Sequence, residues 1–391
     1  MMNILMIAPQ PFFEPRGTPF SVSGRLRALS QLGHDVDLVT YHVGQNLVIP
    51  RVAIFRTPVL RFVRHVPIGP SQTKLFLDVL LLFRALGLML TKRYDLLHTH
   101  EEASFFGVLL ARMFRVPHVY DMHSSLPQQL TNFQYTRFRP MVRLFEWLES
   151  RTINSSDAVI TICPALAEQV RKLNGRVPHL MIENVPSVDE DPEVVSEESL
   201  RRFRLDNSLE GKRVVLYAGN FEPYQGIDLL LSSVEQVVAR AQDAVFLLVG
   251  GKPEQVQHYR DLVAQRGLSS HFRFTGQRPP KEIAGYMRLA EVLVSPRTVG
   301  TNTPLKVYEY LQSGKPMVAT NLPTHTQVLN EDVAVLVAPD PKALALGILS
   351  LLENPACARK VGAHARKLYE SRYSFQSFVK KTELVLRMAI E

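Results

Sequence analysis

Lys306 and Glu309 lie three positions apart in the stretch 295–320, SPRTVGTNTPLKVYEYLQSGKPMVAT. On a helix they would project from one face together with Asn302, about one turn before them. A helix start offers unpaired backbone N–H groups and the positive end of the helix dipole, which attract anions, and Lys306 adds a full charge. A carboxylate one turn further on can accept hydrogen bonds from a vicinal diol. Diphosphate beside diol is the layout of a nucleotide sugar, although an exposed helical ion pair would be the preferred interpretation of these two residues alone.

The helix that would carry these side chains is delimited on both sides by its sequence. Thr303 is a good N-cap, and Pro304 suits the first helical position, where no amide hydrogen is needed. Gly314 can adopt the left-handed conformation just past the helix, and Pro316 prevents its continuation. The sequence therefore predicts the end of a strand, a loop, a short helix and the start of the next strand, in this order.

The same stretch resembles the donor-site signature of glycosyltransferase family 4, whose members are retaining enzymes with the two-domain GT-B fold. That family usually carries two glutamates eight positions apart, with a loop of the type G-x-P-L between them. Glu309 stands at the second glutamate, which faces the ribose, and Thr301 stands at the first, which faces the donor sugar. The resemblance implies that the loop contacts the donor through Thr301, Asn302, Thr303, Pro304 and Leu305. Because Thr301 replaces a glutamate, it puts donor specificity, or activity itself, in question.

A second match lies in VVLYAGNFEPYQG, residues 214–226. In the family, the corresponding strand, loop and helix supply an arginine and a lysine to the donor diphosphate. Asn220 and Gln225 stand at those positions here, and they can hydrogen-bond to phosphate without neutralising its charge. Gly219 keeps the backbone close to the ligand. The resemblance therefore implies that much of the diphosphate charge falls on Lys306.

The remaining donor contacts that the resemblance implies are Arg297, which would assist Lys306, and Arg278, which lies in the segment that brackets the nucleotide base. No Asp-x-Asp follows a strand in the manner of a metal site, because residues 35–37 open a strand and residues 189–191 lie in a predicted linker. We therefore expect neither a metal nor another cofactor. The helix dipole and Lys306 would stabilise the departing diphosphate instead.

Histidines lie at the ends of predicted strands in the first half of the chain. His98 and His100 alternate in DLLHTH and should point the same way, and His123 follows HVYDM. Ligands gather at the carboxyl ends of strands in doubly wound sheets, so His100 and His123 are both placed to face them. His123 matches the family position whose histidine approaches the donor sugar. For His100, a core or capping role remains equally open.

The first turn of the chain contains Gly17 and Thr18. Gly17 permits close backbone approach, and a helix is predicted to begin near Pro19 or Ser21 with its N-terminus facing the ligand. Family 4 enzymes often have a glycine pair here, which implies that Gly17 and Thr18 contact the donor. No G-x-G-x-x-G follows, so a nicotinamide cofactor is not supported.

Short apolar, β-branched runs alternate with helical patterns along the chain, which favours the α/β class with parallel sheets. The predicted strands are residues 3–9, 35–41, 52–58, 95–100, 118–123, 158–163, 179–184, 214–219, 244–250, 272–276, 291–296, 316–320 and 334–339. They predict two doubly wound, Rossmann-like domains, which the resemblance arranges across a cleft. The expected domains are residues 1–185, binding the acceptor, residues 186–372, binding the nucleotide sugar, and residues 373–391, a helix returning to the first domain.

The formal charge of +8 over 391 residues is placed unevenly. Residues 1–185 hold 20 Lys and Arg against 13 Asp and Glu, so this half should attract an anionic partner. We expect a glycan, a lipid-linked or another small anionic acceptor, or peripheral contact with an anionic membrane. No nucleic-acid motif accompanies the charge, so nucleic acid is not an expected partner.

Residues 75–90 are apolar nearly all round, which predicts a buried helix, with a membrane-facing surface as the alternative. The two cysteines are far apart in sequence and do not indicate a disulfide framework. The first residues of the chain predict a strand and not a signal peptide. These features favour a cytoplasmic protein, with peripheral contact at the cytoplasmic face of a membrane.

Residues and resemblance together predict a retaining glycosyltransferase that moves a sugar from a nucleotide sugar to an acceptor hydroxyl without a metal. His123, Lys306 and Glu309 are the expected catalytic residues. Two alternatives remain open, because Thr301, Asn220 and Gln225 depart from the family pattern. One is a catalytically weak nucleotide-sugar-binding scaffold, and the other is a sugar-nucleotide epimerase on the same fold.

Overall fold

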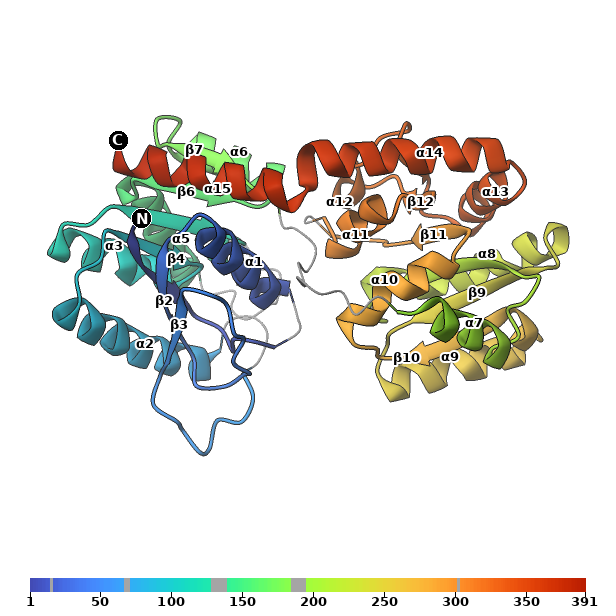
Figure 1. Ribbon diagram of the computed structural model, residues 1–391, viewed down its shortest axis with the longest axis horizontal. Helices are drawn as coiled ribbons and strands as arrows, with labels where there is room; N and C mark the ends of the chain where they lie inside the picture. Colours follow the sequence, from blue (N-terminus) through green and yellow to red (C-terminus); the bar gives the residue numbers. More distant parts are fainter. Residues whose placement is uncertain (15–16, 67–70, 128–138, 184–194, 301–302) are drawn as a thin grey trace. The chain divides into compact units, whose positions relative to one another are not determined.

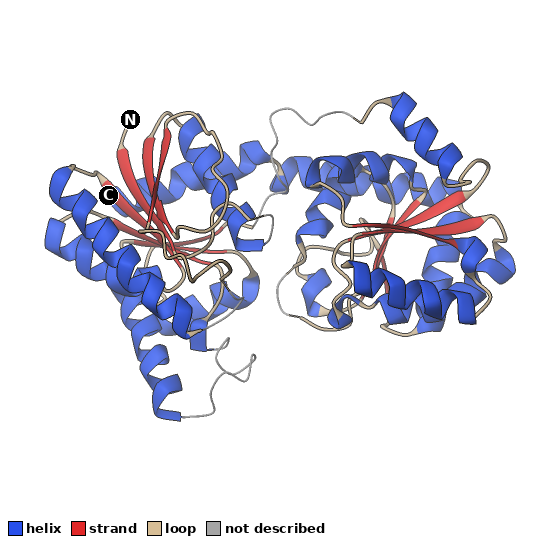
Figure 2. Cartoon of the chain, turned by 90° about the horizontal axis from the view of Figure 1, so that it is seen from below, coloured by secondary structure: helices blue, strands red, loops and turns tan. Residues whose placement is uncertain are grey.

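The computed structural model describes residues 1–14, 17–66, 71–127, 139–183, 195–300 and 303–391. The chain divides into two compact units, of which unit 1 comprises Met1–Val185 with Phe375–Glu391 and unit 2 comprises Pro186–Ser374. In each unit one parallel sheet lies between layers of helices (Figures 1 and 2). This arrangement confirms the predicted α/β class.

Unit 1 is built on a sheet with the strand order β3-β2-β1-β4-β5-β6-β7, in which all pairs are parallel. Its strands are β1 (Asn3–Ala8), β2 (Asp35–Thr40), β3 (Val52–Arg56), β4 (Leu96–His100), β5 (His118–Met122), β6 (Ala158–Thr161) and β7 (His179–Met181). Strand order reverses where β1 pairs with both β2 and β4. Ligands bind outside the carboxyl ends of the strands at such a switch point.

The helices of unit 1 form two layers on this sheet. They are α1 (Gly17–Gln31), α2 (Gln72–Thr91), α3 (Ala103–Phe114), α5 (Arg139–Ser155), α6 (Pro164–Leu173) and α15 (Phe375–Ile390). One hydrophobic core joins α2 and α3 to β1, β2 and β4. On the other side, α15, the last helix of the chain, packs on α1 and β6 (Figure 1). The final helix therefore belongs to unit 1, and it begins at Phe375.

Unit 2 repeats the design with the strand order β10-β9-β8-β11-β12-β13. Its strands are β8 (Arg213–Ala218), β9 (Ala244–Val249), β10 (Phe272–Gly276), β11 (Val292–Ser295), β12 (Met317–Thr320) and β13 (Val335–Val337). Every strand that the sequence predicts is thus present in the two units. Strand β9, AVFLLV, is buried along its whole length, as expected where helices cover both faces of a parallel sheet.

The helices of unit 2 bury these strands in two cores, one on each face. They are α7 (Glu197–Asp206), α8 (Ile227–Arg240), α9 (Pro253–Gln265), α10 (Pro280–Leu289), α11 (Leu305–Ser313), α12 (Pro323–Thr326), α13 (Pro341–Leu352) and α14 (Pro355–Leu368). Two 3₁₀ turns (Pro223–Gln225 and Ser269–His271) and a π-helical turn (Tyr369–Tyr373) complete the unit. Helices α8, α9 and α13 pack on one face, and α7, α10, α11 and α14 on the other.

Two helix starts differ from the prediction. Helix α1 begins at Gly17, before Pro19. Helix α11 begins at Leu305, and Pro304 takes the capping position that was predicted for Thr303. The backbone of Pro304 is extended, with φ −63° and ψ 138°. Pro304 is therefore the last residue of the loop and not the first residue of the helix. The predicted end is confirmed, because Gly314 adopts a left-handed φ of 68° there.

The prediction of a buried helix at residues 75–90 holds for one side of α2 only. Leu77, Leu81, Ala85, Leu88 and Met89 are buried against the sheet. The opposite side exposes a stripe of large apolar residues, namely Leu75, Phe76, Val79, Phe83 and Leu90. Within the described ranges, no helix combines the length with the sustained apolar character that crossing a bilayer requires.

Candidate functional site

The carboxyl edge of the unit 2 sheet is formed by loops that touch backbone to backbone. Gly250 follows β9 with φ 121°, and a Cβ there would lie 1.9 Å from the Gly219 carbonyl oxygen. Gly226 precedes α8 with φ 76°, and a Cβ there would lie 1.9 Å from the Pro296 carbonyl oxygen. Neither contact leaves room for a side chain. The loops after β8, β9 and β11 are thereby drawn together around one point.

The side chain of Lys306 lies beside these loops, next to Gly219 and Gln225. Its side chain is buried, its Nζ donates to Gln225 Oε1 at 3.1 Å, and it lies 3.8 Å from the centroid of the Tyr217 ring. In the described part of the chain no carboxylate lies within ion-pair distance of this ammonium. Burial lowers the pKa of Lys306 well below 10.5, Arg297 lowers it further, and Glu309 opposes the shift.

Gly219 and Tyr217 form the two walls of the slot that holds the ammonium. A Cβ on Gly219 would lie 2.6 Å from Lys306 Nζ and 3.0 Å from the Tyr217 hydroxyl oxygen. That hydroxyl donates to the Asn220 carbonyl at 2.6 Å, so the ring is fixed by the loop that it supports. The Asn220 side chain itself is exposed beside this loop. Gly219, Asn220, Gln225 and Lys306, all predicted donor contacts, thus lie together.

Arg297 brings a second positive side chain to this edge from the end of β11. Its guanidinium carbon lies 5.1 Å from the centroid of the Tyr224 ring, and its Nε donates to the Val299 carbonyl at 2.8 Å. The loop is tied to its neighbours, because the Thr298 N–H donates to the Tyr224 carbonyl at 3.0 Å. Burial lowers the pKa of Arg297. Two cations with lowered pKa values at one edge make it a favourable place for an anion.

Glu309 lies one turn into α11 and is half-buried. Burial raises the pKa of its carboxyl group, and the nearby charge of Lys306 opposes the shift. Arg278 is exposed on the loop after β10, which lies two strands from β8 in the sheet. Thr303, Pro304 and Leu305 lead into α11. Thr301 and Asn302 lie outside the described residues.

In unit 1 the predicted site residues lie at the carboxyl edge of the sheet. Gly17 and Thr18 open α1, the helix that follows β1. His123 comes directly after β5, and it is buried. Its Nε2 lies 3.1 Å from His100 Nδ1 and 3.3 Å from Asp121 Oδ1.

Asp121 and Arg25 form a buried ion pair beside these histidines. Arg25 Nε donates to Asp121 Oδ2 at 3.1 Å, and His98 Nε2 lies 3.2 Å from the same oxygen. His98 and His100 do point to the same face of the sheet, as their alternation predicts, and that face is covered by α1 and α15. The sequence pairs His-x-His on β4 with Asp-x-His at the end of β5, a spacing that could have drawn attention to Asp121.

Among the described residues, His98, His100 and Asp121 offer ligand atoms that all lie within 4.8 Å of one another, close enough for a metal ion. The donor set does not suit a cation, however, because the Arg25 guanidinium already neutralises Asp121 at 3.1 Å and would repel it. We interpret the cluster as a hydrogen-bonded charge network.

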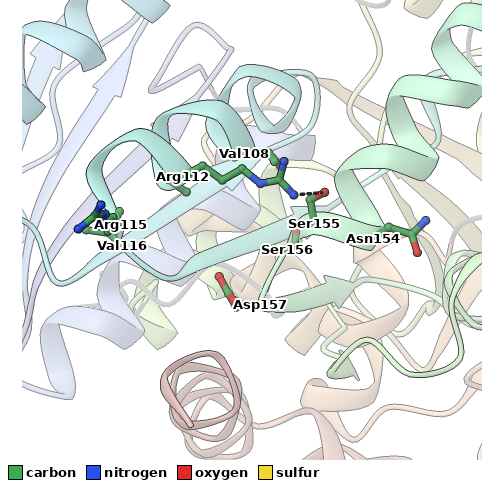
Figure 3. Close-up of a pocket in the computed structure, with 9 residues that line it drawn as sticks. Val108, Arg112, Arg115, Val116, Asn154, Ser155, Ser156 and Asp157 are labelled. Atoms are coloured by element: carbon green, nitrogen blue, oxygen red, sulfur yellow. Dashed lines mark hydrogen bonds between the residues drawn. The ribbon is translucent and has the colours of Figure 1, made fainter.

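A hollow of about 420 Å³ on unit 1 lies away from these residues (Figure 3). Arg112, Arg115, Asn154 and Ser155 line it, and Arg112 donates to the Ser155 hydroxyl at 3.3 Å. It lies at the C-terminal ends of α3 and α5 and just before the start of β5 and β6. This is the amino edge of the sheet, where doubly wound folds do not place their ligands.

The fold and the two edges define an α/β protein of two doubly wound units, one with an anion-attracting carboxyl edge. Comparison with known proteins agrees. The family described as "Glycosyl transferases group 1" matches residues 201–368, and the family described as "Glycosyl transferase 4-like domain" matches residues 17–184.

Individual relatives match over most of the chain. Phosphatidyl-myo-inositol mannosyltransferase of Mycobacterium leprae is 26% identical over 94% of this chain and 93% of its own length. Alpha-D-kanosaminyltransferase of Streptomyces kanamyceticus is 21% identical over 70% of this chain and 71% of its own. The crystal structure of Anabaena HepE with UDP superposes with a TM-score of 0.74 at 18% identity, covering 99% of this chain and 100% of that one.

The chain belongs to the group 1 glycosyltransferases with the GT-B fold. It is therefore a glycosyltransferase, and the resemblance seen in its sequence is confirmed.

Gly219→Ala should weaken binding of UDP roughly tenfold, about 1.4 kcal/mol, because the new methyl group displaces the Lys306 ammonium from its slot. Gly267→Ala is the matched control, since Gly267 also has a positive φ (67°) but open space around its Cβ position. Gly219→Ala should lose more stability in denaturant melts than Gly267→Ala, because φ 149° and the crowded Cβ position tolerate a side chain less well, so affinities are compared on folded protein. Equal UDP affinity of the two variants in calorimetry would contradict the assigned slot.

Proposed function

We propose that this glycosyltransferase transfers a sugar from a nucleotide-sugar donor to an acceptor hydroxyl, with retention at the anomeric carbon and without a metal ion. Unit 2 binds the donor, and unit 1 binds a glycan, a lipid-linked or another anionic acceptor. UDP in the HepE structure supports a nucleotide donor by similarity. The mannosyltransferase relative supports a lipid-linked acceptor by its name.

One observation carries the proposal: the buried ammonium of Lys306 has an amide oxygen and an aromatic ring for neighbours, but no ion-paired carboxylate within the described ranges. Burying an uncompensated charge is costly, and the lowered pKa reflects that cost. A donor diphosphate supplies the missing negative charge. Lys306 lies in the first turn of α11, and the free N–H groups and dipole of a helix start also favour an anion.

The other residues then take roles around that diphosphate. Gly219 leaves space for it, and Asn220 and Gln225 hydrogen-bond to its oxygens. Arg297 shares the negative charge, Glu309 accepts hydrogen bonds from the ribose hydroxyls, and the exposed Arg278 borders the base.

For the donor sugar, the family resemblance implies contacts from the segment Thr301 to Leu305 and from His123, Gly17 and Thr18. The leaving diphosphate is stabilised by Lys306 and the dipole of α11, and its own oxygen accepts the acceptor's proton as the new bond forms on the same face. The protein residues position the two substrates and exclude water.

The direct test is a transfer assay over a panel of nucleotide sugars with glycan and phospholipid acceptors, with the product anomer determined by NMR. We expect one donor to be used, an anomer that matches the donor, and full activity after treatment with a chelator. An inverted product would contradict retention, and activity lost to the chelator but restored by magnesium or manganese would contradict metal independence. Free epimer from the donor alone would favour the epimerase instead.

Affinity for the donor nucleotide should fall as the pH rises. Burial lowers the pKa of Lys306 in the free protein, and a bound diphosphate favours the charged form, so binding takes up protons between the free and bound pKa values. Calorimetry over a series of pH values from neutral to alkaline, in buffers of different ionisation enthalpy, should detect this uptake. Lys306→Met should abolish it. Buffer-independent heats in the wild type would contradict the role of Lys306.

Glu309→Ala should weaken nucleotide-sugar binding by about 1–3 kcal/mol, the scale for losing hydrogen bonds to a charged group. Glu331→Ala, at an exposed position in the same unit, is the matched control and should bind normally. Calorimetry on folded protein decides. An affinity equal to that of the control would remove Glu309 from the donor site.

We also propose peripheral contact of unit 1 with an anionic membrane. Besides the stripe of α2, the loop before this helix exposes Val59 and Phe62, which are 75% and 78% exposed. Arg61 and Arg64 in that loop and Arg84 on α2 are also exposed. Exposed apolar side chains together with cations suit the boundary between acyl chains and anionic headgroups.

Binding to vesicles with anionic lipid should be measurable by sedimentation and should decrease with salt. The double substitution Phe62→Ser and Phe83→Ser should weaken it, because both side chains lie in the exposed stripe. Leu346→Ser, at a half-exposed leucine of unit 2, is the control and should bind as wild type. Equal binding of all three proteins would place the membrane contact elsewhere, and no binding at low salt would leave a water-soluble anionic acceptor as the partner.

A further inference from the structure

The carboxylate of Asp121 lies at the centre of the buried network in unit 1, and each of its oxygens faces a histidine. Oδ2 accepts from Arg25 Nε at 3.1 Å and lies 3.2 Å from His98 Nε2. Oδ1 lies 3.3 Å from His123 Nε2. Within the described part of the chain no donor makes a well-aligned hydrogen bond to Oδ1, and His123 Nε2 is the ring nitrogen that faces it. The His123 ring is therefore the donor available to a buried anionic oxygen.

This geometry distinguishes the two neutral forms of His123. With the proton on Nε2, the ring can donate to His100 Nδ1 at 3.1 Å, and the positive end of the N–H bond also lies close to Asp121 Oδ1. With the proton on Nδ1, the Nε2 lone pair would face the carboxylate oxygen at 3.3 Å in a buried, low-dielectric place. Repulsion between lone pair and carboxylate disfavours that form. The proton therefore belongs on Nε2, and the lone pair of Nδ1 is left for a ligand.

Arg25 keeps Asp121 charged and in place. Burial alone would raise the pKa of Asp121, but the Arg25 guanidinium and the surrounding histidines hold it well below its usual range. Arg25 is in turn held by α15, because its Nη1 donates to the Thr382 hydroxyl and its guanidinium carbon lies 4.4 Å from the centroid of the Phe378 ring. The last helix of the chain is thereby linked to His123 by two contacts in turn, from Arg25 to Asp121 and from Asp121 to His123.

We propose that Asp121 and Arg25 are positioning residues that fix His123 with its proton on Nε2, so that Nδ1 accepts a hydrogen bond from a substrate hydroxyl. The substrate in this statement rests on the proposed transfer function, whereas the tautomer does not. A carboxylate that holds an imidazole in one tautomer and orientation is a known way of preparing histidine for catalysis. Here α15 completes the arrangement from the far end of the sequence.

The test is the tautomer of His123 in the full-length protein labelled with ¹⁵N-histidine, read from long-range ¹H–¹⁵N correlation spectra and assigned with His123→Gln. We expect the Nε2–H form in the wild type, and a mixture of tautomers in Asp121→Asn. His118 is the internal control, because its ring contacts Thr99 and Ser156 on the other face of the sheet and should not change. A wild-type His123 with its proton on Nδ1 would overturn the inference.

Two further variants keep the opposite charges of the ion pair and test the same inference if Asp121→Asn does not fold. Thr382→Val removes the hydrogen bond from Arg25 and the bond of the same hydroxyl to the Phe378 carbonyl within α15, and Arg25→Lys keeps the charge. In both, the tautomer of His123 should become less uniform. Where transfer is measurable, kcat should fall roughly tenfold or more while KM for the donor stays within about twofold. Unchanged spectra and unchanged kcat in both folded variants would contradict the positioning role.

The two proposals fail separately. If the Nε2–H form is found and no nucleotide sugar is consumed, the tautomer assignment stands and the transfer function falls. If transfer is found with the proton on Nδ1, the function stands and the positioning role falls.

Discussion

The charge of Lys306 is the constraint around which the unit 2 edge is organised. Its ammonium is buried between Gly219 and Tyr217 with only an amide oxygen as a hydrogen-bond acceptor in the described ranges. A protein interior tolerates such a charge when something else supplies the compensation. The loops are in close contact at glycines, and the ammonium is buried at this edge.

Unit 1 solves the opposite problem. Its buried charge, Asp121, is fully compensated inside the unit by Arg25, with histidines around the remaining oxygen surface. A buried pair of this kind is weak evidence for stability, because desolvation offsets much of the attraction. In the positioning role that we propose, its consequence is orientation, because the ion pair holds the carboxylate beside the histidines that face it. The two units therefore hold buried charge in different ways: Lys306 has no ion-paired carboxylate in the described ranges, whereas Asp121 is paired with Arg25.

The chain order gives this second arrangement a particular form. Arg25 comes from α1, Asp121 from β5 and Thr382 from α15, so the first and last helices of unit 1 meet at one guanidinium. The chain leaves unit 1, builds the whole of unit 2 and returns with α15. Unit 1 is thus complete only after the last residues have been added, and the environment of His123 depends on them.

The sequence by itself determined the strands, the α/β class, the end of α11 at Gly314 and the stretches that meet at the carboxyl edges. Those features follow from local patterns: apolar runs of strand length, glycine where φ must be positive, and the rule that parallel strands gather their carboxyl ends at one edge. Only the tertiary structure decided which side chains meet there. Lys306 and Gln225 are separated by 81 positions, and Arg25 and Thr382 by 357, so their contacts depend on strand order and layer packing. The sequence could not predict the exposed side of α2 for the same reason. The apolar pattern of a helix does not show how much of its surface the neighbouring elements cover.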